Sequence, residues 1–131
     1  MSLEFDDDTC ALLDGKNFAI VATLNEDGSP HTSAVWIARD GNAVLFSTTA
    51  ERRKGRNLGR DPRISLTVTD AHNPYNSVDI QGTADLIEDP SKSLPRRLSR
   101  KYLGEDPPTE PADVVRLIVR VTPRKITGFS A

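Results

Sequence analysis

The pair Asp40-Gly41 constrains what this chain can fold into more than any other feature. It separates two apolar stretches, residues 31–39 and 43–47. Aspartate followed by glycine suits the two-residue type I′ turn of a β-hairpin, because both central residues of that turn need a positive φ. A further apolar run, residues 18–24, comes before the turn-forming stretch 25–30. The first fifty residues therefore predict three antiparallel strands.

Two short helices are predicted on either side of these strands. The first is a short capped helix in which Asp7, Asp8 and Thr9 precede the residues 10–13, and it ends at Gly15. Thr48 and Glu51 have the spacing of a capping box, so the second helix is expected directly after the third strand. It should end near Gly59, because the residue before Pro62 avoids the α region.

The rest of the chain predicts more strands. Residues 63–68 alternate polar with apolar side chains, and residues 77–87 alternate less cleanly, as in a strand bent at Gly82. Residues 114–129 supply one long strand or two short ones broken at Pro123. About six antiparallel strands result, and strands of this number commonly close into a barrel, which removes exposed edges. We therefore predict one mainly β domain over residues 1–131.

A third helix is predicted between the last two strands. Asp89-Pro90 has the order of residues that favours a helix start, and Gly104 would end the helix. Pro95 is unfavourable inside a helix, so a start nearer to Pro95 is the alternative. Its apolar face would consist of Leu94, Leu98 and Tyr102. Its solvated side would consist of Arg96, Arg97, Arg100 and Lys101.

Composition excludes several classes of protein. The chain has 131 residues, 37% of them hydrophobic, which suffices for one core but leaves little for an enclosed ligand cavity. A sizeable site is therefore expected between two copies of the chain. The net charge of −2 argues against general nucleic-acid binding. An acidic start and short apolar runs predict a cytoplasmic protein with no signal peptide or membrane span.

Residues 52–57, with the sequence RRKGRN, carry the clearest chemical signal. On a helical wheel Arg52 shares a face with the two other exposed arginines of the helix, whereas Lys54 and Asn57 lie on the side of Leu58. Leu58 is the only large apolar residue of this helix, so its side should face the protein. A cation turned inward needs an anionic partner. No local carboxylate is evident, and a ligand phosphate would serve, helped by the hydroxyls of Ser47, Thr48 and Thr49 and by the helix N-terminus.

Two glycines in the same helix support this interpretation. Gly55 and Gly59 each cost roughly 1 kcal/mol relative to alanine inside a helix. On one side of the helix they would let another surface or a ligand approach the backbone closely. The alternative is that a basic run on a short helix is only a solvated face.

Four stretches in a fixed order resemble one known superfamily. They are ATLNEDGSPH at 22–31, continuing to Val35-Trp36; LFSTT at 45–49 with KGRNLGRDPR at 54–63; NPY at 73–75 with QGTA at 81–84; and PRKITGF at 123–129. Together they resemble the F420-dependent branch of the pyridoxamine 5'-phosphate oxidase-like, FMN-binding split-barrel superfamily. The resemblance implies a six-stranded antiparallel split β-barrel that forms a homodimer with two cofactor sites at the subunit interface.

The resemblance also implies site residues. Arg52, Lys54 and Asn57 would hold the cofactor phosphate, with Ser47, Thr48 and Thr49 beside them. Val35 and Trp36 would lie near the ring system, although packing in the core is an equal alternative for Trp36. The second subunit would contribute the loop with Pro74 and Tyr75.

The implied activity is hydride transfer between coenzyme F420, a 5-deazaflavin, and a small organic acceptor. Such chemistry resides in the cofactor and needs no nucleophile or acid–base pair from the protein. The chain lacks the arginine-rich carboxy-terminal segment of true pyridoxamine-phosphate oxidases, so oxidation of vitamin B6 is not expected. Three alternatives stay open: an FMN flavoprotein, a non-catalytic cofactor-binding protein, and a barrel for single-stranded nucleic acid, for which the aromatic content of 5% is low.

Other kinds of site lack their sequence signals. The two histidines, His31 and His72, lie far apart, and Cys10 is the single cysteine, so no spacing suits a metal. No strand is followed by the glycine fingerprint of a Rossmann fold, and no P-loop sequence occurs.

Overall fold

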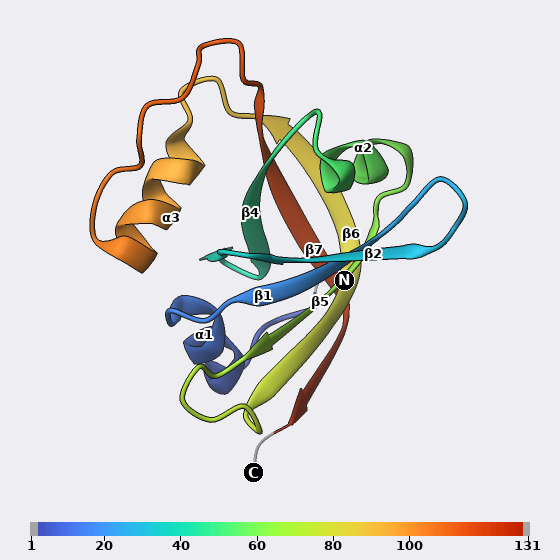
Figure 1. Cartoon of the computed structure of the whole chain (residues 1–131). Helices are drawn as coiled ribbons and strands as arrows, with labels where there is room; N and C mark the ends of the chain where they lie inside the picture. The colour runs from blue at the N-terminus through green and yellow to red at the C-terminus, as the bar shows by residue number, and fades with distance from the viewer. Residues whose placement is uncertain (1–2, 130–131) are drawn as a thin grey trace.

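The computed structural model describes residues 3–129 and shows a mainly β fold with short helices, as the sequence predicts (Figure 1). The strands are β1 (Ala19–Leu24), β2 (Pro30–Val35), β3 (Ala38–Asp40), β4 (Ala43–Thr49), β5 (Arg63–Thr69), β6 (Ser77–Glu88) and β7 (Arg116–Phe129). The helices are α1 (Asp7–Asp14), α2 (Arg53–Arg60) and α3 (Ser93–Leu103). Every pair of neighbouring strands is antiparallel.

The strands form one sheet in the order β2-β1-β5-β6-β7-β4-β3. Its two edge strands, β2 and β3, are separated in the chain only by Trp36 and Ile37. Val35 and Ala38 are three steps apart in the chain, which span at most about 11 Å, so the end of β2 lies close to the start of β3 and the sheet curls into a split barrel. The sequence predicted a single strand over residues 31–39. That prediction is wrong in one respect, because the chain turns a corner at Trp36-Ile37, where β2 leaves β1 and β3 joins β4.

The barrel interior holds the main hydrophobic core. Alternate side chains of the strands point inward, among them Val21, Phe46 and Ile80, and each of these is almost fully buried. Leu13 of α1 and Leu58 of α2 belong to the same core. Each large apolar side chain buried there stabilises the fold by roughly 1.5–3 kcal/mol. These buried side chains therefore hold both helices against the barrel. Helix α1 lies at the lower left of Figure 1 and α2 at the upper right.

Helix α3 packs outside the barrel. Leu94 and Leu98 contact Ala38 and Leu45, and Tyr102 lies partly buried beside them, which confirms the predicted apolar face. Gly104 ends the helix with a left-handed φ of 76°, also as predicted. The helix begins at Ser93, later than Pro90, and Asp89 caps it by accepting hydrogen bonds from the backbone N–H groups of Ser93 and Leu94. Within residues 3–129, no helix has the length and apolar character needed to cross a membrane.

A β-bulge bends β6 at Gly82, as the sequence predicts. Gln81 pairs with Lys125 whereas Gly82 pairs with Pro123, so Arg124 is the extra residue of the bulge. A Cβ atom on Gly82 would lie 2.3 Å from the carbonyl oxygen of Thr122, which only glycine avoids. The bulge also accommodates Pro123, so β7 continues unbroken past it.

Candidate functional site

The end of β4 meets the start of α2. The backbone N–H of Arg52 donates to the carbonyl oxygen of Thr49 over 3.2 Å. A Cβ atom on Gly55 would lie 2.2 Å from the same oxygen, so the close approach of the helix depends on glycine here. This confirms the role predicted for Gly55. No atom lies within 4 Å of a Cβ built on Gly59, so in this chain nothing approaches that position.

The start of α2 differs from the prediction. Thr48 and Glu51 do not form a capping box, because Thr48 belongs to β4 and the helix begins only at Arg53. The strand continues to Thr49 because its backbone pairs with β7 there. Arg52 occupies the N-cap position, and no side chain caps the helix. Within the described residues 3–129, the first N–H groups of α2 therefore have no side-chain acceptor.

Lys54 is the unusual residue of this region. It is 8% exposed and lies on the inner side of α2, as predicted, whereas Arg52, Arg56 and Arg60 are exposed. No carboxylate among residues 3–129 lies within ion-pair distance of its ammonium group. Burial lowers the pKa of Lys54, and the positive charge of Arg52 lowers it further. An anion bound here would remove this penalty.

The hydroxyl groups at the end of β4 face two sides. Ser47 and Thr49 lie on the same side of β4 as Leu45, which is the outer side. The Ser47 hydroxyl is buried without a hydrogen-bond partner in the described part of the chain. Thr48 shares the inner side with Phe46 and is fully buried, also without a partner. The structure thus separates Thr48 from Ser47 and Thr49, which the prediction had grouped together.

Asn57 is 2% exposed, and its amide is used inside the protein. The Nδ2 group donates to Thr23 Oγ1 and to Asn25 Oδ1, each over 3.0 Å. Its Oδ1 atom accepts from Nη2 of Arg60 over 3.1 Å. The residue predicted to bind phosphate therefore links α2 to the end of β1.

Val35 and Trp36 lie at the corner between β2 and β3. Val35 packs partly against the barrel core. The Trp36 ring stacks on Tyr102, with centroids 5.2 Å apart and planes 7° apart, and it remains half-buried. The Tyr102 hydroxyl donates to the carbonyl oxygen of Asn17 and accepts from the N–H of Ile37. Packing thus accounts for one face of Trp36, through a tyrosine whose role at this corner was not predicted.

Pro74 and Tyr75 lie far from α2 within one chain. They belong to the loop between β5 and β6, drawn at the bottom of Figure 1, while α2 is at the top. Both are exposed, and the Tyr75 side chain is 67% exposed. The carboxylate of Asp70 holds the loop by accepting from the N–H of His72. The structure therefore places the predicted residues of β4 and α2 on adjacent elements, and this loop away from both.

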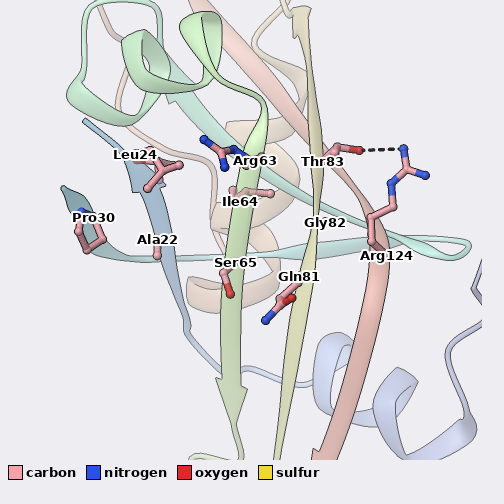
Figure 2. Close-up of a pocket in the computed structure, with 11 residues that line it drawn as sticks. Ala22, Leu24, Pro30, Arg63, Ile64, Ser65, Gln81, Gly82, Thr83 and Arg124 are labelled. Carbon is pink, nitrogen blue, oxygen red and sulfur yellow. Dashed lines mark hydrogen bonds between the residues drawn. The ribbon is translucent and has the colours of Figure 1, made fainter. Parts of the chain in front are cut away.

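A groove of about 400 Å³ on the outer face of β1, β5, β6 and β7 contains none of the predicted site residues. Gly82 lines it between two arginines, Arg63 and Arg124, and Ala22 and Leu24 line it on the other side of Arg63 (Figure 2). Arg63 forms an ion pair with Asp61, and Arg124 makes a long contact of 3.5 Å with Thr83 Oγ1. The bulge places Arg124 beside this groove. In the sequence, only the glycine and the proline of the bulge pointed to this position of Arg124.

The residues at the β4–α2 junction fit an anionic group. Within residues 3–129, the largely buried Lys54 has no counter-charge, the buried Ser47 hydroxyl has no hydrogen-bond partner, and the N-cap residue of α2 makes no side-chain cap. These three features are what a phosphate needs, namely a cation, a hydroxyl donor and free backbone N–H groups.

The chain is similar in sequence and fold to proteins of known structure. The profile of the pyridoxamine 5'-phosphate oxidase family matches residues 5–130. A solved structure described as an F420 reductase is 33% identical over 89% of this chain and 94% of its own, with a TM-score of 0.79. The conserved hypothetical protein Rv2991 from Mycobacterium tuberculosis is 23% identical over 98% of this chain and 86% of its own, also with a TM-score of 0.79.

A third solved structure shows how far the fold extends beyond sequence similarity. General Stress Protein 26 from Bacillus anthracis is 13% identical over 94% of this chain and 92% of its own, with a TM-score of 0.71. The resemblance found in the sequence is thereby confirmed at the level of family and fold. This chain belongs to the pyridoxamine 5'-phosphate oxidase family, which binds flavins and includes oxidoreductases.

Proposed function

We propose that this protein is an F420-dependent reductase, which transfers a hydride between the deazaflavin coenzyme and a small organic acceptor. The resemblance of the sequence and the 33% identity to an F420 reductase support this choice within the family. FMN is the second candidate cofactor, because the family as a whole binds flavins.

Lys54 carries the proposal. Lys54 is largely buried without a counter-charge, its pKa is lowered by that burial, and a bound anion would favour its charged form. The cofactor phosphate would accept hydrogen bonds from the Lys54 ammonium group and the Ser47 hydroxyl. Exposed Arg52 would flank them at the start of α2.

The bound cofactor supplies the hydride carrier, and the protein's residues bind and orient it. Lys54 and Ser47 anchor its phosphate end. The half-buried face of Trp36, held by Tyr102, would border its ring system. No proton-transferring side chain is assigned, because the reaction needs none from this chain.

A homodimer belongs to the same proposal. The loop with Pro74 and Tyr75 lies too far from α2 to join the site within one chain, so a second copy would have to bring it there. Phe18 and Ile20 are about half exposed at and near β1, which indicates a surface that a second copy could cover. Sedimentation velocity should show two copies per particle, whereas a monomer at micromolar concentration would contradict this part of the proposal.

Titration of the purified protein with coenzyme F420 and with FMN, followed by fluorescence, tests the function. We expect a dissociation constant below about 0.1 mM, near −5.5 kcal/mol, for one of them. The variant Lys54→Ala should lose about 1.5–3 kcal/mol of binding free energy, since it removes a charge-assisted contact. Arg56→Ala is the matched control, because Arg56 is an exposed cation of the same helix.

Four outcomes separate the candidates. Binding of neither cofactor would overturn the proposal, and full affinity in Lys54→Ala would remove Lys54 from the site. A yellow protein with flavin absorption on purification would favour FMN. Tight binding without turnover, across a broad panel of electron acceptors, would instead identify a carrier protein.

A further inference from the structure

Helix α2 has little stability of its own. It has eight residues, two of them glycines, and its N-terminus has no side-chain cap. Leu58 is its only large apolar side chain. Helices of this length are not stable in isolation, so the position of α2 depends on its contacts with the rest of the protein.

The polar contacts of α2 converge on the end of β1. Both N–H groups of the Asn57 amide are used, one toward Thr23 Oγ1 and one toward Asn25 Oδ1. Nη2 of Arg60 donates to the carbonyl oxygen of Leu24 over 2.7 Å and to Asn57 Oδ1 over 3.1 Å. We call these residues, Thr23, Leu24, Asn25, Asn57 and Arg60, the α2 clamp.

The acceptors of the α2 clamp are themselves fixed. Thr23 is 1% exposed at the end of β1. Asn25 begins a tight turn in which its N–H donates to the carbonyl oxygen of Ser29, and its own carbonyl oxygen accepts from the N–H of Gly28. Gly28 has a φ of 86°, which suits glycine. Asn57 is therefore held by a rigid surface.

An asparagine amide has only two N–H donors, and here both are engaged within the protein. Asn57 could donate to a phosphate only by leaving the α2 clamp. It lies three residues after Lys54, so the two side chains share one side of the helix.

We propose that Asn57 is a positioning residue, which through the α2 clamp holds Lys54 inward, ready for the phosphate of the proposed function, and does not itself contact the ligand. A direct role in phosphate binding, the alternative that the sequence favoured, is an outcome of the test below.

The variant Thr23→Val tests the clamp, because it keeps the shape of a buried side chain and removes one acceptor of Asn57. Two quantities are measured: the affinity for the cofactor, and the pKa of Lys54 by NMR of protein with labelled lysine. The Lys54 signal is assigned by its loss in Lys54→Arg. Without the clamp Lys54 should reach solvent, so its pKa should rise toward the ordinary value and the affinity should fall about tenfold.

Asn57→Ala should give the same two changes, and the double variant should be no worse than Asn57→Ala alone. Thr67→Val is the matched control, since it removes a threonine hydroxyl of β5 that donates to Asp79 and touches no residue of the α2 clamp. Should Thr23→Val fail to fold, Arg60→Gln removes the other arm of the clamp from an exposed position.

Loss of affinity in Asn57→Ala with an unchanged pKa of Lys54 would overturn the proposal in favour of direct contact. An unchanged pKa in all clamp variants would overturn it as well. The pKa comparison needs no cofactor, so it decides on the clamp even where the wild-type protein binds neither F420 nor FMN, a result that would refute only the proposed function.

Discussion

Helices α2 and α3 each carry several cations and one lysine that is turned toward the protein, and the two lysines differ in their partners. The ammonium group of Lys101 in α3 donates to the carbonyl oxygens of Leu13 and Ile37, each over 2.8 Å. Lys54 in α2 has no such partner within residues 3–129. Burial lowers the pKa of both, that of Lys101 to about 8. Lys101 therefore joins α3 to α1 and to the β2–β3 corner, whereas Lys54 has no structural partner and is the residue that we propose to bind an anion.

The largest effect is expected for Lys101→Met. Removing the ammonium group leaves the carbonyl oxygens of Leu13 and Ile37 without their donor, where α1 and the β2–β3 corner meet α3. We expect the free energy of unfolding to fall by about 2 kcal/mol in a denaturant titration. Stability equal to that of the wild type would show that Lys101 does not stabilise the fold, and the two lysines would then not differ as described.

The two glycines of α2 differ in the same way as the two lysines, since Gly55 contacts another element and Gly59 does not. Gly55→Ala puts a methyl group against the carbonyl oxygen of Thr49, so the helix must move away from β4. We expect a loss of about 1–2 kcal/mol of stability, together with weaker cofactor binding. Gly59→Ala is the matched control, since open space surrounds that position, and it should gain about 0.5–1 kcal/mol. Equal behaviour of both variants in thermal melts would show that α2 does not pack as described.

A smaller effect concerns a cation that, unlike Lys54, has its counter-charge. Arg116 pairs across the sheet with Thr49, and its guanidinium group binds both carboxylate oxygens of Glu110. This contact lowers the pKa of Glu110 to about 2. Glu110→Gln should therefore cost about 1 kcal/mol at pH 7, a modest figure because solvent screens a partly exposed pair.

The pH dependence of that variant has a defined sign. The unfolded chain binds a proton at Glu110 below its ordinary pKa, near 4.5, while the folded chain does so only near 2. Stability from this pair is thus complete above that ordinary pKa and disappears as the pH falls toward the folded value. The difference between wild type and Glu110→Gln should vanish in the same range, and a constant difference down to that point would contradict the assignment.

The local part of the fold could be predicted from the sequence. The strands, the bend at Gly82 and the inward side of α2 follow from alternation, turn residues and the position of Leu58, all of which are properties of neighbouring residues. The corner at Trp36-Ile37 could not be predicted, because it depends on which remote strands pair with β2 and β3. The capping box was misjudged for the same reason, since pairing with β7 keeps Thr48 in a strand.

The candidate site was predictable to a similar extent. The burial of Lys54 follows from the helical wheel, whereas the partners of Asn57 and Lys101 come from segments far away in the chain. Lys101 was assigned to the solvated side of α3, and this is wrong because Leu13 and Ile37 present their carbonyl oxygens there. Arg96, Arg97 and Arg100, assigned to the same side, are exposed as predicted.

Thermal melts of Lys54→Met, with and without each cofactor, test whether Lys54 is held for an anion. Without ligand the variant should be at least as stable as the wild type, because it removes a buried cation that has no partner. The rise in melting temperature that coenzyme F420 or FMN gives the wild type should disappear. A variant that loses stability as Lys101→Met does, and still shows the full rise with cofactor, would contradict the claim.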